Sequence, residues 1–295
     1  MTNIAQSTAL TGPHDALARL HHAIETRLEA LLPVAGGERD LVAAAMRDCT
    51  LAPGKRLRPL LFVLAAEGLG ACPKAALDVG CAVEMVHAAS LVLDDLPCMD
   101  DATLRRGRAT LHLAFGEDVA LLAAIALLSR AFGLVASVEG VAPLVRADLV
   151  ATLAEAIGSQ GLVKGQLQDL RDGALPRSAE QIAETNQLKT GALFGAILAM
   201  AGRLAEAQPS VQAPLQRFAV ELGQAFQLHD DLRDGDPGNG KDPGQDHGKS
   251  TMLALCGEAL VRERLRTHVA CAERCLWEAS LGEQPIMLLV RKVFG

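Results

Sequence analysis

Apolar residues recur every three or four positions along most of the 295-residue chain. From His14 to Leu32 this spacing places leucines and an isoleucine on one face, as in a helix that buries one side. Proline and glycine end such segments, and no stretch alternates between apolar and polar residues as a half-buried strand does. The pattern predicts helices over 14–32, 38–48, a segment that ends at 69, 73–95, 116–138, 143–157, 178 onward, 211–234 and 251–281, with a last helix running to the end. Ser178 with Gln181 fits a capping box at a helix start. Pro97 interrupts the 73–95 helix just after Asp95, which lets Asp100 and Asp101 fold back towards the first pair of aspartates.

These helices are expected to form one all-α domain. The length alone allows two domains, but the sequence contains no repeat of fixed period and no linker between two cores. Ala and Leu dominate the apolar residues, while there are seven Phe, one Trp and no Tyr, which favours helix over sheet. We therefore expect a flexible tail over 1–14 and a single domain over 15–295.

Charge and composition exclude several classes of protein. The net charge of −7 gives no broad basic surface, so nucleic acid is not an expected partner. The N-terminus lacks the basic start and apolar core of a signal peptide, and the longest apolar run, 119–128, is too short to span a bilayer. The seven cysteines form no CxxC pair, which fits reduced thiols. The sequence predicts a cytoplasmic protein without stable membrane insertion.

The stretch HAASLVLDDLPCMDDATLRRGR, residues 87–108, concentrates charge at the end of an apolar helix. It contains Asp94, Asp95, Asp100 and Asp101, and then Arg105, Arg106 and Arg108. Clustered carboxylates repel one another unless a cation joins them, and Mg²⁺ binds through carboxylates and substrate phosphates. Arginines suit phosphate oxygens. Taken alone, the stretch fits equally well a metal-bridged phosphate site and a solvated acidic helix end followed by a basic turn.

A second acidic segment, FQLHDDLRD at 226–234, favours the first interpretation. Asp230 and Asp234 are four residues apart and share a helix face, and Asp231 lies beside them. Like charges at this spacing destabilise a helix, so a shared cation is the simplest explanation. Two acidic helix ends that face each other across a cavity can hold a cluster of Mg²⁺ ions around one diphosphate.

Two loop segments add cations. The Gly- and Pro-rich segment 235–250 carries Lys241 and Lys249, and we interpret it as a lid that closes on bound phosphate, although a plain mobile loop has the same composition. The turn before the helix that ends at 69 carries Lys55, Arg56 and Arg58. Packed before a buried helix, these cations could bind a phosphate, but by itself this turn is more typical of a solvated surface.

Together these residues resemble the trans-isoprenyl diphosphate synthases. DDLPCMDD and DDLRD resemble the two aspartate-rich motifs of that family, and GKRLRP, RRG, GQLQDL, KTGALF and GK…GKST follow in the family's order, from about residue 15 to the end. The resemblance implies the isoprenoid synthase fold, an all-α helical bundle around a central cavity, and a homodimer. It implies a Mg²⁺-dependent reaction, with three ions per site, that joins isopentenyl diphosphate head to tail to an allylic diphosphate.

The resemblance also implies residue roles. Metal ligands would be Asp94, Asp100 and Asp230, supported by Asp95, Asp101, Asp231 and Asp234. The allylic diphosphate would be held by Arg105, Lys189, Thr190, Gln227, Lys241 and Lys249, and isopentenyl diphosphate by Lys55, Arg58, His87 and Arg106. His87 taken alone is more typical of a satisfied core histidine. Its place seven residues before Asp94, two turns down the same face, agrees with the ligand role.

Product length is predicted from the same helix. Ala89 is five residues before Asp94, about 7.5 Å along a helix, where an elongating chain would meet the wall. Farnesyl-producing relatives with this form of the first motif carry an aromatic residue there, whereas Ala89 and Ser90 are small. The small residues leave room for another isoprene unit, so we predict a C20 product, geranylgeranyl diphosphate. The stretch VHAASLVLDDLPCMDDATLRRGR also resembles bacterial geranylgeranyl diphosphate synthases more closely than farnesyl ones. Alternatively, Ala89 only packs against a neighbouring helix.

Three other functions compete with this prediction. A farnesyl diphosphate synthase shares every motif. A class I terpene cyclase shares the fold, but it lines its cavity with aromatic rings, of which this chain has few, and usually has an Asn/Ser/Glu metal motif in place of DDLRD. A non-catalytic partner subunit would have lost an acidic motif or the basic residues, and both are present here.

Overall fold

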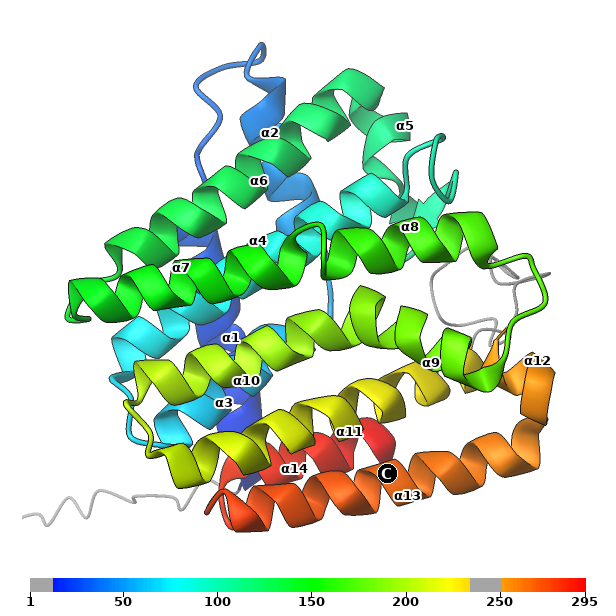
Figure 1. Ribbon diagram of the computed structural model, residues 1–295. Helices are drawn as coiled ribbons and strands as arrows, with labels where there is room; N and C mark the ends of the chain where they lie inside the picture. The colour runs from blue at the N-terminus through cyan, green and yellow to red at the C-terminus, as the bar shows by residue number, and fades with distance from the viewer. Residues whose placement is uncertain (1–12, 234–250) are drawn as a thin grey trace, which may run out of the picture.

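The long apolar helix α4, Pro73–Asp94, lies in the middle of the bundle and carries the first acidic motif at its C-terminal end (Figure 1). The structure is a computed structural model and describes residues 13–233 and 251–295. Most of α4 is buried, and it packs mainly against α6, Glu117–Ser137, and α3, Leu57–Gly68. A helix that is apolar on nearly all sides belongs in the interior, which is why this element sets the position of the others.

The remaining elements surround this centre. They are α1 Pro13–Leu31, α2 Leu41–Leu51, β1 Leu104–Arg105, β2 Arg108–Ala109, α5 Leu111–Phe115, α7 Pro143–Ile157, α8 Leu162–Asp172, α9 Ala179–Asn186, the π-helical turn η1 Gln187–Gly191, α10 Ala192–Leu204, α11 Pro209–Arg233, α12 Met252–Cys256, α13 Glu258–Glu278 and α14 Pro285–Phe294. The predicted all-α fold is confirmed. One hydrophobic core reaches from Leu17 to Val290, and a smaller cluster of Ile182, Leu228, Met252 and Val261 joins α9, α11, α12 and α13.

Local sequence signals fix the helix starts. Proline is the first residue of α4, α7 and α14, where its missing N–H costs no hydrogen bond. The capping box predicted from Ser178 and Gln181 is present, with both reciprocal bonds formed. Asp40 caps α2 by accepting from the Ala43 N–H.

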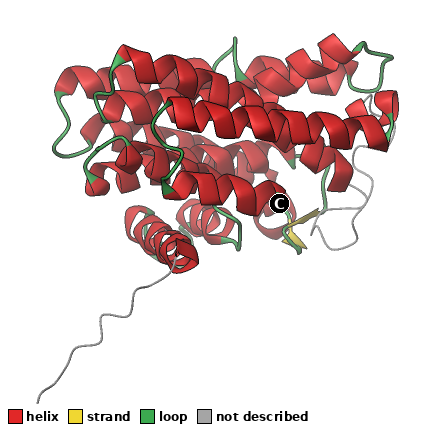
Figure 2. Cartoon of the chain, turned by 90° about the horizontal axis from the view of Figure 1, so that it is seen from below, coloured by secondary structure: helices red, strands yellow, loops and turns green. Residues whose placement is uncertain are grey.

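Three details differ from the prediction. The segment 251–281 is two helices rather than one, because Gly257 adopts φ 77° between α12 and α13. Residues 104–109 form a two-stranded hairpin that the alternation pattern is too short to indicate, and Figure 2 shows it at one end of the bundle. Helix α11 starts at Pro209 and continues through Pro214. The expected tail lies almost entirely outside the described residues.

Buried charges inside the bundle are paired. Arg56 and Glu84 are both nearly inaccessible and lie 2.8 Å apart, and the Arg56 guanidinium also donates to the Ala52 carbonyl. Asp78 of α4 accepts two hydrogen bonds from Arg27 of α1. Since an unpaired buried charge is strongly unfavourable, these pairs explain how α4 tolerates acidic residues in the core. Arg56, a candidate anion-binding residue of the turn, therefore has a structural role.

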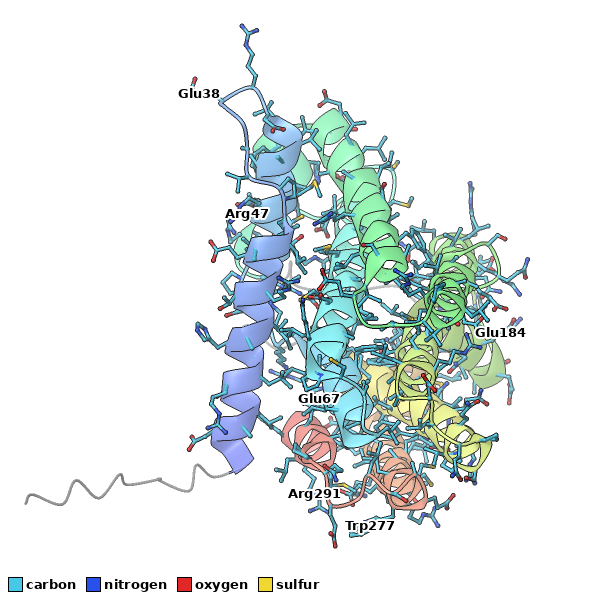
Figure 3. All side chains as sticks on the ribbon, turned by 90° about the vertical axis from the view of Figure 1, so that its left-hand side faces the viewer. Glu38, Arg47, Glu67, Glu184, Trp277 and Arg291 are labelled. Carbon is cyan, nitrogen blue, oxygen red and sulfur yellow. The ribbon has the colours of Figure 1, made fainter. Side chains whose placement is uncertain are left out.

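The outermost helices leave one apolar surface exposed. Figure 3 shows α1 along one side of the bundle, near Arg47 of α2, and Glu184 of α9 on the opposite side. Helices α4 and α6 are long and apolar enough to cross a membrane, but 72% and 44% of their apolar windows are buried. The less buried helix, α6, exposes Leu121, Leu122 and Ile125. These three large apolar side chains lie within five residues of one another on α6.

Candidate active site

The C-terminal ends of α4 and α11 lie at the same end of the bundle and border a cavity of about 650 Å³ (Figure 1). α8, η1, the turn at 53–58 and the hairpin supply the other walls. The lining includes most of the predicted site residues: Lys55, Arg58, His87, Ser90, Asp94, Asp100, Arg105, Arg106, Lys189, Thr190, Gln227, Asp230 and Asp231. Asp234, Lys241, Lys249 and the predicted lid lie outside the described residues.

Only some aspartates of the first acidic motif line the cavity. α4 ends at Asp94, and the chain folds back so that the Asp100 N–H donates to the Asp94 carbonyl at 2.9 Å. This return, expected from Pro97, places Asp94 and Asp100 on the cavity wall. Asp95 is buried and bound by Arg105, and Asp101 is exposed. Among the described lining residues, the motif is thus represented by Asp94 and Asp100.

The hairpin positions two arginines. Its turn residues, Arg106 and Gly107, have φ of 56° and 75°, as a two-residue turn of type I′ requires. Arg105 binds Asp95, with Nε donating at 2.9 Å. The Arg106 guanidinium packs over Gly54, where a Cβ would lie 2.8 Å from Nη1. The glycines of GKR and RRG therefore serve to bring Arg106 against the 53–58 turn.

The turn η1 presents Lys189 and Thr190. The Lys189 Nζ donates to Asp169 of α8 at 2.7 Å, and Thr190 donates to the Gln227 side-chain oxygen at 3.4 Å. α8 approaches η1 closely at Gly165, where an added Cβ would lie 2.2 Å from the backbone nitrogen of Lys189. Burial lowers the pKa of Lys189, but the charges of Asp169 and Asp94 outweigh it, and the net pKa is raised. Lys189 is therefore a fixed cation.

The second acidic motif faces the first from α11. Asp230 and the buried Asp231 both line the cavity, and Gln227 donates to Asp231 at 2.9 Å. Gln227 thus links Thr190 of η1 to the acidic motif one turn further along α11. The structure brings together two predicted clusters that are far apart in the sequence.

A separate basic region lies around Arg58. Arg58 is half-buried at the cavity wall, and its guanidinium carbon lies 5.1 Å and 5.7 Å from the ring centroids of Phe194 and Phe226. Burial lowers its pKa to about 10, which leaves it protonated near neutral pH. Its Nη1 is 3.3 Å from His87 Nε2. Burial, with the nearby Arg58 and Arg106, holds the pKa of His87 well below its usual range, so neutral His87 accepts this bond on Nε2.

The cavity carboxylates fit Mg²⁺ in their chemistry. Burial raises the pKa of Asp94 to about 6; Lys189 opposes this effect and Asp100 adds to it. No described residue makes a hydrogen bond or ion pair with the Asp94 side chain, since Arg105 and Lys189 bind Asp95 and Asp169. The described residues contain no preassembled group of three metal-binding side chains. The site therefore offers oxygen ligands to Mg²⁺ but leaves positions for substrate oxygens and water.

The cavity also contains residues that the sequence did not single out for a role. Gln166, Arg177, His229 and Arg233 all line it. Arg177 lies in the loop before α9 and donates to Thr185, so its contribution depends on a loop whose path cannot be read from spacing. The signal for Gln166 was present, because it is three residues before Asp169 on one helix face.

The two residues predicted to set product length have different surroundings. Ser90 lines the cavity, and its hydroxyl donates a hydrogen bond to the His87 carbonyl. Ala89 is fully buried in the hydrophobic core and is outside the described cavity lining. Of the two, Ser90 is therefore the one in direct contact with the space that a substrate would occupy.

Comparisons with known proteins point to one family. The family described as polyprenyl synthetase matches residues 39–269. A geranylgeranyl diphosphate synthase of Pantoea ananas is 54% identical over 264 residues, 89% of this chain and 87% of that protein. One of Pseudescherichia vulneris is 47% identical, covering 92% and 89% of the two chains. The crystal structure of an FPP/GFPP synthase from Zymomonas mobilis, in apo form, has a TM-score of 0.85 at 33% identity and covers 96% of this chain and 99% of its own.

If the cations of the cavity bind an anion, Lys189→Gln and Arg105→Gln will each weaken the affinity of the protein for pyrophosphate, measured in the presence of Mg²⁺, about tenfold. A hydrogen bond to a charged group contributes about 1.5–3 kcal/mol, and about 1.4 kcal/mol corresponds to a tenfold change in Kd. Isothermal titration calorimetry measures the change, with the exposed Lys74→Gln as control. Affinities within about twofold of the wild type for both cavity variants would contradict the anion site.

Proposed function

The chain belongs to the polyprenyl synthetase family, and we propose that it joins isopentenyl diphosphate head to tail to allylic diphosphates and releases geranylgeranyl diphosphate. The observation that supports this proposal most directly is a single cavity lined by carboxylates from the ends of α4 and α11. Separate sets of cations lie beside these carboxylates. The accepted allylic substrates would be the dimethylallyl, geranyl and farnesyl diphosphates. One catalytic domain over 15–295, located in the cytoplasm, would carry out the reaction.

The allylic diphosphate would bind between the acidic motifs. Lys189, Thr190 and Gln227 approach this region from η1 and α11, and Arg105 approaches it from the hairpin. Lys241 and Lys249 are proposed to complete the set. Because Asp169 and Asp95 hold Lys189 and Arg105 in place, little side-chain entropy remains to be lost when the anion binds. Asp95 would thus act by positioning Arg105.

Asp94, Asp100 and Asp230 would hold Mg²⁺, and we propose three ions per site. Asp231 and Asp234 would support them, and Asp101 would act through water. When bound, Mg²⁺ would stabilise the departing diphosphate without proton transfer. A cation beside Asp94 would also favour its ionised form, which the buried site otherwise disfavours.

Isopentenyl diphosphate would bind on the basic side, to Lys55, Arg58, His87 and Arg106. Three of these groups are cations, and the guanidinium of Arg58 lies over the contacting rings of Phe194 and Phe226. Neutral His87 offers its remaining N–H to a phosphate oxygen. A diphosphate held by cations alone lacks the metal-assisted path to ionisation, which explains why one substrate ionises and the other remains intact.

The reaction needs no protein nucleophile. The allylic C1–O bond breaks, and its electron pair leaves with the diphosphate, so the hydrocarbon becomes a delocalised cation. The double bond of isopentenyl diphosphate then supplies the electron pair of the new C–C bond. A proton leaves the adjacent carbon, restores a double bond and is accepted by the released diphosphate. Lys189 and Arg105 would stabilise the charge that develops on that leaving group.

The competing functions have less support. A terpene cyclase would need aromatic rings to stabilise cations, but Phe226, the one phenylalanine or tryptophan in the described cavity lining, already contacts Arg58. A non-catalytic subunit would not need both acidic faces and both sets of cations. A farnesyl diphosphate synthase remains the alternative on chemistry, because the two activities differ only in where chain growth stops.

We further propose a homodimer built on α6. Leu121, Leu122 and Ile125 are 45%, 51% and 55% exposed on the outer face of this helix, and Leu113 of α5 is 57% exposed. A second copy presents the same apolar face, so one twofold contact covers both. Charged residues are absent from α6 between Asp118 and Arg130, which fits burial at an interface.

We predict that Asp94→Ala and Asp230→Ala each abolish most turnover while the helical circular dichroism signal is preserved. Each carboxylate faces the cavity and not the core. The exposed Asp101→Ala serves as the matched control from the same motif, and we expect a smaller loss. A near-normal rate for either main variant at limiting Mg²⁺ would refute the metal assignment.

For the product, mass spectrometry of the wild type with both diphosphates and Mg²⁺ is expected to give C20. Ser90→Phe, which places a ring directly in the cavity, and Ala89→Phe are expected to shift the product towards C15. Ser90→Val tests for bulk without an aromatic ring and should retain C20. A wild type that stops at C15 favours the farnesyl alternative, and C20 from both aromatic variants would refute the role of this helix.

For the assembly, Leu122→Glu combined with Ile125→Glu should convert the dimer to a monomer, because buried unpaired charge opposes association. Sedimentation velocity measures the halved mass. Trp277→Glu, on the exposed face of α13 far from α6 in Figure 3, is the control and should remain dimeric. An unchanged dimer in the double variant would place the interface elsewhere.

A further inference from the structure

Gln166 of α8 is a buried polar side chain at the cavity wall. It is 7% exposed and lines the cavity together with Leu162 and Asp169 of the same helix. Neither its carboxamide oxygen nor its nitrogen has a hydrogen-bond partner among the described residues. A buried amide without partners costs stability, and it is retained where something outside the chain supplies the bond.

The order of residues along α8 locates this amide relative to substrate. Asp169 binds Lys189 of the diphosphate region, and Leu162, two turns before it, is apolar. Gln166 lies between them, about 4.5 Å along the axis from Asp169. Its depth is fixed, because its neighbour Gly165 packs directly against the backbone of η1. Along α8, the cavity is thus lined first by the charged Asp169, then by the neutral amide of Gln166 and then by the apolar Leu162. A prenyl diphosphate has the same order: a charged diphosphate, then the reacting carbons, then the hydrocarbon tail.

We propose that Gln166 is a further catalytic residue, whose carboxamide lies beside the reacting carbons of the allylic substrate and stabilises the cation formed there. This inference rests on the proposed function. When the C1–O bond breaks, the electron pair leaves with the diphosphate and the positive charge spreads over the allyl group. An amide oxygen stabilises that charge as a fixed dipole but, unlike a carboxylate, is too weak a nucleophile to capture the cation.

Gln227, the other cavity glutamine predicted for the site, has a different role. Its oxygen accepts from Thr190 and its nitrogen donates to Asp231, so its amide already joins η1 to the second acidic motif. The Gln166 amide makes no such hydrogen bond to a described residue. The amide of Gln227 is thus held by its neighbours at the diphosphate region, whereas no described residue engages the amide of Gln166.

The test is Gln166→Met, which keeps the length of the side chain and removes the amide. We expect kcat to fall about tenfold or more, with KM for both diphosphates within about threefold. Solvolysis of the allylic diphosphate, with an unreactive isopentenyl analogue bound, should slow in parallel, because it reports ionisation alone. The Tm should rise by about 2 °C or more, since the unpaired buried amide is gone. Gln166→Leu should behave in the same way.

Gln168→Met on the same helix is the matched control. The Gln168 oxygen accepts from the Thr185 hydroxyl at 3.3 Å, and the residue lies outside the described cavity lining. Its loss should lower the Tm and leave kcat within about threefold, the reverse of the Gln166 result.

Unchanged kcat and solvolysis in Gln166→Met, or a lower Tm with kcat unaffected, would assign Gln166 a structural role and overturn the proposal. A wild type that forms no prenyl product would refute the proposed function and this inference with it. An active wild type with an active Gln166→Met would refute this inference alone.

Discussion

Repulsion between carboxylates is the constraint on which the site depends. Asp94 and Asp100 at the end of α4, and Asp230 and Asp231 near the end of α11, border one cavity. Among the described residues, Arg105 binds Asp95 and Lys189 binds Asp169. Burial raises the pKa of Asp94 to about 6, so the free protein holds this group at an energetic cost. A divalent cation bound with a diphosphate would remove that cost, and we therefore expect the two ligands to bind cooperatively.

The same constraint explains why the two diphosphate sites differ. On the acidic side, we propose that an anion binds together with metal, which would stabilise the charge of its leaving group. On the basic side, Arg58 and Arg106 attract an anion directly, while His87 stays neutral because burial and these arginines lower its pKa. In this proposal, the charges of the two regions separate the substrate that ionises from the one that attacks. Arg56, in the middle of the basic turn, contributes to stability by pairing with Glu84.

The sequence predicted most of this arrangement because the chemistry is local. Aspartates at helix ends, a capping box at Ser178 and a return at Pro97 depend only on neighbouring residues, and each was found in the structure. Spacing along one helix cannot show which side chains face each other across the bundle. Ala89 was predicted at the cavity and is buried in the core, whereas the Gln166 amide has no hydrogen-bond partner within 13–233 and 251–295 and was assigned no role. The hairpin that positions Arg106 was missed because two-residue strands are too short for a pattern.

The central claim is that the two acidic helix ends jointly hold divalent ions on one diphosphate. Anomalous scattering from crystals grown with Mn²⁺ and an unreactive allylic diphosphate measures this directly. The account predicts metal peaks in coordination contact with Asp94 on one side of the diphosphate and with Asp230 on the other. Peaks at only one motif, or a diphosphate bound at Arg58 with no metal at either aspartate, would contradict it.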